Sequence, residues 1–367
     1  MSQEAVNQFR AWIAEQGLDA FLVTQPQNRS YLSGWLNDDT EGSGLLLVSQ
    51  QEQIILTNTL YKEVAAKEAV GWEVTTPASH EYAPAIVTAA QQYGWKKIGF
   101  ESMATLFGVY EKIRSGGEGI FTLVPFEHSY VDKLRQIKQP YELELLKRAI
   151  AITDETFTHI CQWIQPGMTE KEVQWEITRY MVALGADGLA FESIVASGPN
   201  GSMPHAHPSD RRIQRGELIT IDMGARYKGY CADMTRTICL GEPAEPRMRE
   251  VYDAVLNAMK TCEAGLYAGM QGRAADALAR NALDMAGLAE YYIHSTGHGV
   301  GLQIHEGPGL SARSPEDMIL PAGTVVTVEP GAYIPGWSGT RVEDCVLVKE
   351  DGCEVLTQSP TELILQR

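Results

Sequence analysis

Two stretches of the sequence repeat the same pattern 102 residues apart. The motif Pro-Gly-Met-Thr-Glu-Lys-Glu-Val around Gly167 resembles Ala-Gly-Met-Gln-Gly-Arg-Ala-Ala around Gly269. The same offset separates Gly185 from Gly287, and both follow helical patterns as C-capping glycines do. Each stretch predicts a long helix, a glycine break, a second helix and then strands. This part of the chain is therefore predicted to consist of two related halves whose strands face one central site.

Local signals place a domain junction upstream of the first half. Pro140 is a favoured first residue of a helix, and Thr169 with Glu172 forms a capping box at the start of the next helix. We expect domains at residues 1–132 and 133–367. The first domain reads as a small α/β domain, because helical and strand-like patterns alternate in it. Helical patterns cover 11–16 and 60–68, and strand patterns cover 20–23 and 44–48.

Five potential metal ligands lie in short apolar or glycine-rich segments, where charge is costly to bury: Asp222, Asp233, His298, Glu329 and Glu343. Asp222 and Glu329 each end a β-branched run that is typical of a core strand. A lone carboxylate there would be penalised by several kcal/mol. A turn at residues 227–229 would let Asp222 and Asp233 face each other on a hairpin.

Charge balance predicts what compensates these acids. Taken alone, each acidic residue is better read as solvated or salt-bridged. Four carboxylates gathered in one pocket carry four negative charges, which two divalent cations would balance, with the neutral imidazole of His298 completing the ligand set. Oxygen-rich sites with one nitrogen suit Mn, Co or Zn. In hydrolases, carboxylates can bridge two such ions that lie about 3.5–4 Å apart.

The five positions stand in the segments Ile-Asp-Met-Gly-Ala, Ala-Asp-Met-Thr-Arg, Thr-Gly-His-Gly-Val-Gly, Val-Glu-Pro-Gly and Arg-Val-Glu-Asp. Together they resemble the pita-bread metallopeptidases, and the Xaa-Pro peptidase subgroup most, over about residues 135–367. The resemblance implies an α+β fold, in which helices cover a curved antiparallel sheet with pseudo-twofold symmetry. The segment Asn-Arg-Ser-Tyr-Leu-Ser-Gly from Asn28 resembles the start of a creatinase-type N-terminal domain.

The resemblance also implies how the metals are held. Asp222 would bind one metal, His298 and Glu329 the other, and Asp233 and Glu343 would bridge both. Manganese is the first choice, with cobalt or zinc as alternatives. A hydroxide between the metals would attack the scissile carbonyl, and Glu329 would pass the water proton to the leaving nitrogen.

Further residues match positions near the substrate. His205 and His305 match substrate-facing histidines that would stabilise the oxyanion. Because His305 lies seven residues after His298, the chain must bend at the glycines between them. Tyr333 and Arg341 match family positions beside the metals. His207 and His294 are assigned a surface or indirect role, in which His294 could orient His298.

These matches imply an Xaa-Pro peptidase whose substrate is a small peptide with proline in second position. Such a bond lacks an N–H and has a fixed φ, so it escapes most peptidases. Arg313 is the candidate for binding the free carboxylate of a dipeptide, which favours an Xaa-Pro dipeptidase (prolidase) over an Xaa-Pro aminopeptidase (aminopeptidase P). A creatinase or a non-catalytic peptide-binding module is disfavoured, because both would lack metal ligands.

Composition limits the partners. The net charge of −17 argues against nucleic acid and anionic membranes. The sequence has no apolar run of about 18 residues, no signal-peptide pattern at its start and no Cys-x-x-Cys pair, so we expect a cytoplasmic protein. Relatives suggest a homodimer. The acidic segment 38–41 is read as a solvated loop, with contact to a substrate amine as the alternative.

Overall fold

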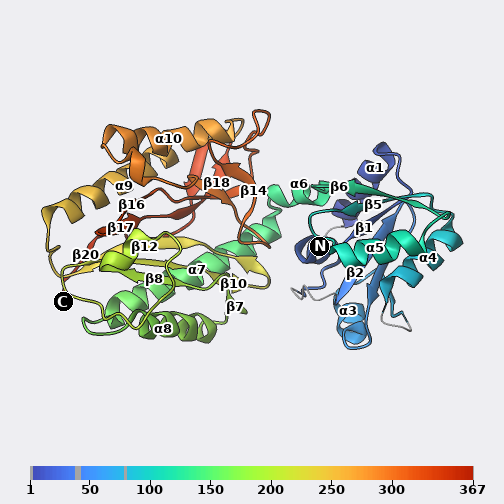
Figure 1. The fold of residues 1–367 in the computed structure, drawn as a ribbon, viewed down its shortest axis with the longest axis horizontal. Helices are drawn as coiled ribbons and strands as arrows, with labels where there is room; N and C mark the ends of the chain where they lie inside the picture. The colour runs from blue at the N-terminus through green and yellow to red at the C-terminus, as the bar shows by residue number, and fades with distance from the viewer. Residues whose placement is uncertain (1–2, 38–42, 78–80, 367) are drawn as a thin grey trace. The chain divides into compact units, whose positions relative to one another are not determined.

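The computed structural model describes residues 3–37, 43–77 and 81–366. The chain divides into two compact units, Met1–Arg135 and Gln136–Arg367, each with its own sheets and core (Figure 1). The acidic segment 38–41 lies outside the described residues. No helix in the described part of the chain is long and apolar enough to cross a membrane.

The first unit is an α/β domain with one mixed sheet, as predicted. Its strands are β1 (Ala20–Val23), β2 (Gly44–Ser49), β3 (Gln53–Thr57), β4 (Glu73–Thr75), β5 (Lys97–Glu101) and β6 (Thr122–Phe126). Its helices are α1 (Gln3–Glu15), α2 (Pro26–Ser33), α3 (Lys62–Glu68), α4 (Tyr82–Tyr93), α5 (Phe107–Gly116) and α6 (Tyr130–Gln136). The strand order is β4-β3-β2-β1-β5-β6, with β1 antiparallel to β2 and parallel to β5. Apolar side chains of these strands pack against α4 and α5.

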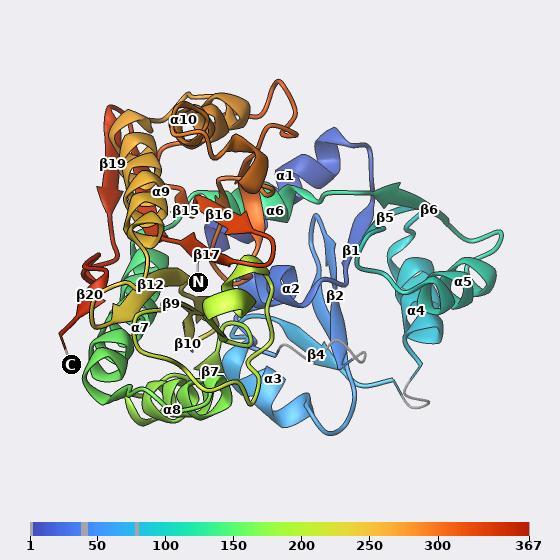
Figure 2. The ribbon, with the colours of Figure 1, turned by 60° about the vertical axis from the view of Figure 1, so that its left-hand side comes forward.

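The second unit contains two helix pairs, each followed by strands. The helices are α7 (Pro140–Trp163), α8 (Glu170–Ala183), α9 (Pro246–Gly265) and α10 (Gly272–Met285), with short 3-10 helices η1 (Gly198–Ser202) and η2 (Ala289–Tyr291). After the first pair come β7 (Gly188–Leu189), β8 (Ile194–Ser197), β9 (Leu218–Met223), β10 (Ala225–Tyr227), β11 (Tyr230–Cys231) and β12 (Met234–Leu240). After the second pair come β13 (Gly297–Gly299), β14 (Glu306–Leu310), β15 (Val325–Val328), β16 (Gly331–Ile334), β17 (Ser338–Arg341), β18 (Asp344–Lys349), β19 (Gly352–Val355) and β20 (Ile364–Leu365). Figure 2 shows the strands between the two helix pairs.

The repeated glycines take equivalent conformations in the two halves. Gly167 and Gly269 have φ of 91° and 89°, and Gly185 and Gly287 have φ of 94° and 72°. Side chains other than glycine rarely adopt this left-handed region, so each glycine ends or interrupts its helix at the same point. The predicted capping box at Thr169 is also present. The prediction of two related halves is confirmed.

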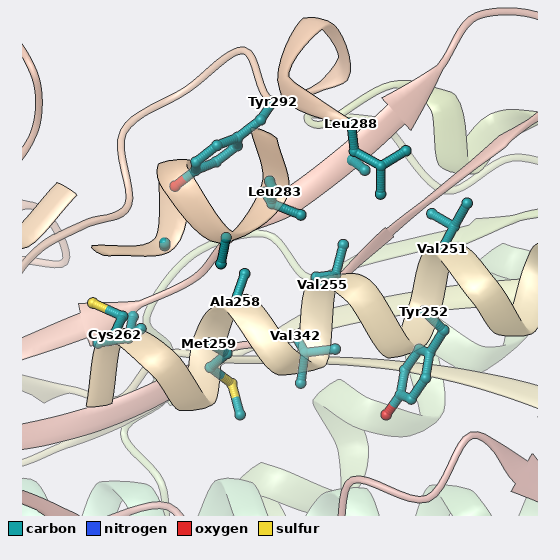
Figure 3. Close-up of a cluster of buried hydrophobic side chains, with 14 of the residues drawn as sticks. Val251, Tyr252, Val255, Ala258, Met259, Cys262, Leu283, Leu288, Tyr292 and Val342 are labelled. Carbon is teal, nitrogen blue, oxygen red and sulfur yellow. The ribbon is translucent and has the colours of Figure 1, made fainter. Parts of the chain in front are cut away.

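Each half of the second unit has its own apolar core. In the first half, α7 and α8 pack on β9 and β12 through residues such as Ile177 and Ile221. In the second half, α9 and α10 pack together and onto the strands, and Figure 3 shows Val255 and Met259 of α9 with Leu283 and Val342 in this cluster. Two of the sheets then meet at the centre of the unit. One is β20-β12-β9-β8, in which β8, β9 and β12 come from the first half, and the other is β14-β13-β15-β18-β19 from the second half.

Candidate metal centre and active-site cavity

The strand ends of the two halves converge on one cavity of about 370 Å³ in the second unit. All five candidate metal ligands line it. Asp222 lies in β9, Asp233 between β11 and β12, His298 in β13, Glu329 directly after β15, and Glu343 between β17 and β18. Two ligands therefore come from the first half and three from the second, as the sequence predicted.

A tight hairpin and a close strand crossing bring the acids together. Lys228 and Gly229, both with positive φ, form the two-residue turn between β10 and β11, which confirms the turn predicted there. Across the neighbouring pair of strands, Asp222 stands opposite Thr235. The backbone N–H of Glu343 donates to the carbonyl of Thr235 at 3.0 Å, so the two halves meet directly at the ligands.

Three of the carboxylates form a compact buried cluster. Ligand oxygens of Asp222, Asp233 and Glu343 lie within 4.8 Å of one another, and these residues are 8%, 6% and 2% exposed. Nε2 of His298 lies 3.6 Å from Oδ2 of Asp233 and 3.3 Å from Oε1 of Glu329. The five side chains thus surround one small volume.

The donor set fits divalent metal ions. Oδ1 of Asp222 and Oε1 of Glu343 are buried without a hydrogen-bond partner in the described part of the protein. An unpaired buried carboxylate oxygen is costly, and a cation is the partner that would satisfy it. Nδ1 of His298 contacts the carbonyl of Gly299 at 3.1 Å, which turns Nε2 toward the acids, as in many metal-binding histidines.

One cation and one hydroxyl organise the cluster. Arg341 donates to Oδ2 of Asp222 at 2.6 Å and to Oγ1 of Thr235 at 3.0 Å. Thr235 donates in turn to Oε2 of Glu343 at 2.7 Å. Asp222 and Glu343 therefore each have one carboxylate oxygen hydrogen-bonded to the protein, and the other oxygen can bind a metal ion. Thr235, which sequence reasoning did not single out, links the two acids.

Burial and mutual repulsion shift the pKa values of these groups. Burial, reinforced by the charge of Glu343, raises the pKa of Asp233 well above its usual value, and burial with the charge of Glu329 does the same for Glu343. Burial also raises the pKa of Glu329, but the hydrogen bond and charge of His298 outweigh it and bring that pKa to about 2. These shifts follow from the crowding of buried carboxylates in one small volume.

The two histidines assigned to the substrate stand at the cavity. His205 and His305 are exposed residues that line it. The rings of His298 and His305 lie 4.2 Å apart, edge to face. Residues 301–305, which connect β13 to β14 between the two histidines, form a bend. The predicted bend is present.

His294 contacts Tyr333, whereas the sequence interpretation allowed it to orient His298. The Tyr333 hydroxyl accepts from Arg341 at 2.7 Å and lies 2.9 Å from Nε2 of His294. Nδ1 of His294 contacts the carbonyl of Ser295 at 2.8 Å. Both ring nitrogens of His294 are thus engaged, and the ring contacts Tyr333, not His298. Among the described residues, Tyr333 stands behind the cavity lining, whereas His294 and Arg341 belong to it.

Arg313 stands apart from the cavity. It is exposed on the loop after β14, where its backbone N–H donates to Oγ of Ser311 at 3.2 Å. In the described part of this chain, Arg313 is not among the lining residues. His207, to which the sequence analysis assigns a surface or indirect role, lines the cavity, 3.8 Å from a carboxylate oxygen of Glu192.

Two conserved-family models match the chain. The model of "Metallopeptidase family M24" matches residues 144–350, and that of "Creatinase/Prolidase N-terminal domain" matches residues 6–137. The chain belongs to the M24 metallopeptidases, hydrolases that work with divalent metal ions. The predicted family and fold class are confirmed.

Individual relatives match over nearly the whole chain. An Xaa-Pro dipeptidase from Pyrococcus furiosus is 33% identical over 99% of this chain and 100% of its own length. The structure of an Xaa-Pro dipeptidase from Bacillus anthracis superposes with a TM-score of 0.91 at 40% identity, covering 98% of this chain and 99% of that one. An X-Pro aminopeptidase from Thermotoga maritima gives a TM-score of 0.89 at 34% identity, covering 98% and 99%.

Proposed function

We propose that this chain is a dinuclear metal-dependent Xaa-Pro dipeptidase. The observation that carries the proposal is the convergence of four carboxylates and His298 on one cavity, with two buried oxygens that lack a partner. Full-length relatives named Xaa-Pro dipeptidase support the substrate class.

Two divalent ions would be held by the five candidate ligands. Asp222 would bind one ion, His298 and Glu329 the other, and Asp233 and Glu343 would bridge them. The ions would lower the pKa of a bound water and polarise the scissile carbonyl. Manganese is our first choice, because four carboxylates and one imidazole form an oxygen-rich donor set; cobalt and zinc are the alternatives.

The side chains of the cavity then divide the remaining work. Glu329 lines the cavity beside His298 and would accept the water proton and pass it to the leaving nitrogen. Burial lowers the pKa of His305, which therefore presents a neutral imidazole whose N–H can donate to the oxyanion. His205 faces the same cavity and would bind the substrate beside it.

The cavity wall suits a proline ring. Phe191, Ile194 and Ile304 line it beside the histidines. The Xaa-Pro bond has no N–H for an enzyme to bind, so recognition has to rest on the apolar ring and its fixed geometry. These three apolar side chains would supply that recognition.

An Xaa-Pro aminopeptidase is the second candidate. The Thermotoga maritima relative carries that name at an identity close to those of the dipeptidases. A dipeptidase needs a cation for the free carboxylate of its substrate, and Arg313, proposed for that role, is exposed away from the lining residues. We further propose that the protein acts in the cytoplasm and forms a homodimer. Sedimentation analysis of the purified chain tests the oligomeric state.

The deciding experiment compares Ala-Pro with Ala-Pro-Ala as substrates. Metal-stripped protein is assayed before and after addition of Mn, Co or Zn, with Asp233→Asn as the ligand variant and Asp253→Asn, an exposed residue on α9, as its matched control. We expect metal-restored cleavage of Ala-Pro by wild type and Asp253→Asn only. Preference for Ala-Pro-Ala would make the protein an aminopeptidase, and cleavage of neither peptide by metal-loaded protein would refute proline specificity.

A further inference from the structure

Glu170, the first residue of α8, is a fully buried carboxylate outside the candidate metal centre. A buried carboxylate is costly unless it is surrounded by hydrogen-bond donors and a counter-charge. The helix is already capped by Thr169 and Glu172. The backbone N–H of Thr169 donates to the Glu172 carboxylate, and the backbone N–H of Glu172 donates to the Thr169 hydroxyl. The burial of Glu170 therefore needs another explanation.

The carboxylate of Glu170 binds both ends of one chain segment. Its Oε1 accepts from the backbone N–H and the hydroxyl of Ser197, both at 2.8 Å. Its Oε2 accepts from the backbone N–H of Ser209 at 3.0 Å and from the hydroxyl at 2.6 Å. The amide of Asn200 donates to both oxygens, at 3.1 and 3.0 Å. One side chain thus closes the segment 198–208 into a loop.

This loop supplies a wall of the active-site cavity. Five consecutive residues, from Pro204 to Pro208, line the cavity, and His205 is the second of them. The far side of the loop is held by the second half of the unit, because Arg341 donates to the carbonyl of Pro204 at 3.3 Å and Ser338 to that of Gly198 at 2.9 Å. The position of His205 therefore depends on where Glu170 holds the loop ends.

The surrounding hydrogen-bond donors favour a carboxylate at this position. Arg211 donates to the hydroxyl of Ser197 at 2.6 Å and forms an ion pair with Glu217. The Ser197 hydroxyl accepts from Arg211 and is therefore directed to donate to Glu170. In the described structure, Glu170 accepts from two backbone N–H groups, two serine hydroxyls and the Asn200 amide. A glutamine would turn its N–H₂ group toward one of the two backbone N–H groups, which cannot accept a hydrogen bond.

We propose that Glu170 is a positioning residue, which holds the loop 198–208 at both ends and thereby sets His205 against the substrate. This inference rests on the proposed peptidase function. Glu170 lies 35 positions before His205 in the sequence. It would act on the reaction through the loop that it orders, without touching the substrate.

The test uses Glu170→Gln, with Glu172→Gln as the matched control on the same helix. Hydrogen exchange of metal-free protein is measured across the loop, because this readout needs neither metal nor substrate. The kcat/KM for Ala-Pro of metal-loaded protein is then measured for each variant in the wild-type and His205→Ala backgrounds. A metal titration checks that Glu170→Gln still loads fully.

We expect Glu170→Gln to speed exchange in residues 198–208 and to lower kcat/KM about tenfold, while Glu172→Gln stays within about twofold. In the His205→Ala background, Glu170→Gln should lower kcat/KM by less than about twofold, because both changes act through the side chain of His205. If Glu170→Gln does not fold, Ser209→Ala, which removes one donor at one loop end, replaces it with the same expected pattern.

Unchanged exchange in the loop overturns the proposal, whatever the peptide activity. Equal losses of kcat/KM in both backgrounds also overturn it, because Glu170 would then act independently of His205. If wild type cleaves no Xaa-Pro peptide, the proposed function fails by itself. The exchange data in that case still decide whether Glu170 orders the cavity wall.

Discussion

Thr235 offers the sharpest test of how the protein holds its acids together. The side chain is fully buried, donates to Glu343 at 2.7 Å and accepts from Arg341 at 3.0 Å. The change Thr235→Val keeps the shape and removes both hydrogen bonds. A hydrogen bond to a charged group is worth about 1.5–3 kcal/mol, so the loss of two predicts a destabilisation of about 3 kcal/mol or more.

The assay is urea unfolding of the second unit in metal-free protein. With a slope of about 3 kcal/mol/M, a loss of 3 kcal/mol lowers the midpoint by about 1 M. The matched control is Thr340→Val, since Thr340 is equally buried but its hydroxyl lacks a partner in the described structure. We expect that control to change stability by less than about 0.5 kcal/mol. Equal midpoints for the two variants would refute the role given to Thr235.

Three further predictions concern charge. Glu329→Gln should lower kcat/KM for Ala-Pro by about 10²–10⁴-fold, the usual contribution of a general acid–base, in a steady-state assay at full metal loading. Arg341→Lys should cost about 100-fold in the same assay, because a lysine cannot reproduce the guanidinium contacts to Asp222 and its neighbours. Burial, with the charge and hydrogen bond of Asp344, raises the pKa of Glu263 to about 8. The folded protein therefore binds this proton more tightly than the unfolded chain does. The contribution of protonated Glu263 to the free energy of unfolding is complete below the unfolded pKa of about 4.3 and is lost as the pH rises through about 8. Glu263→Gln should not lose this contribution, so its urea midpoint should rise relative to that of wild type as the pH increases over this range. A difference in midpoint between the two proteins that stays constant with pH would contradict the assignment.

The elements that carry short-range signals were predictable from the sequence. The glycines 102 residues apart mark equivalent helix ends because only glycine adopts their backbone conformation readily. The hairpin turn and the capping box at Thr169 are likewise local, since their partners lie within a few residues. The four acidic candidate ligands stood out because acids inside apolar segments are rare.

Contacts between distant segments were not predictable in this way. Nothing near Thr235 in the sequence indicates that its hydroxyl meets Glu343, 108 residues away. His294 is predicted to have a surface or indirect role, with orientation of His298 as a possibility, and its contact to Tyr333, 39 residues away, has no local signal. The sequence places Glu170 and Glu172 alike in the first turn of a helix. Which of the two is buried depends on the loop that folds over α8.

The most direct test of the central claim is the number of metal ions the protein binds. Calorimetric titration of metal-stripped protein with Mn should give two ions per chain for wild type and for Asp253→Asn. Asp233→Asn, which loses a proposed bridging carboxylate, should bind fewer than two. A wild-type chain that binds one ion or none, or an Asp233→Asn variant that retains both, would contradict the assignment of these buried acids to a dinuclear metal centre.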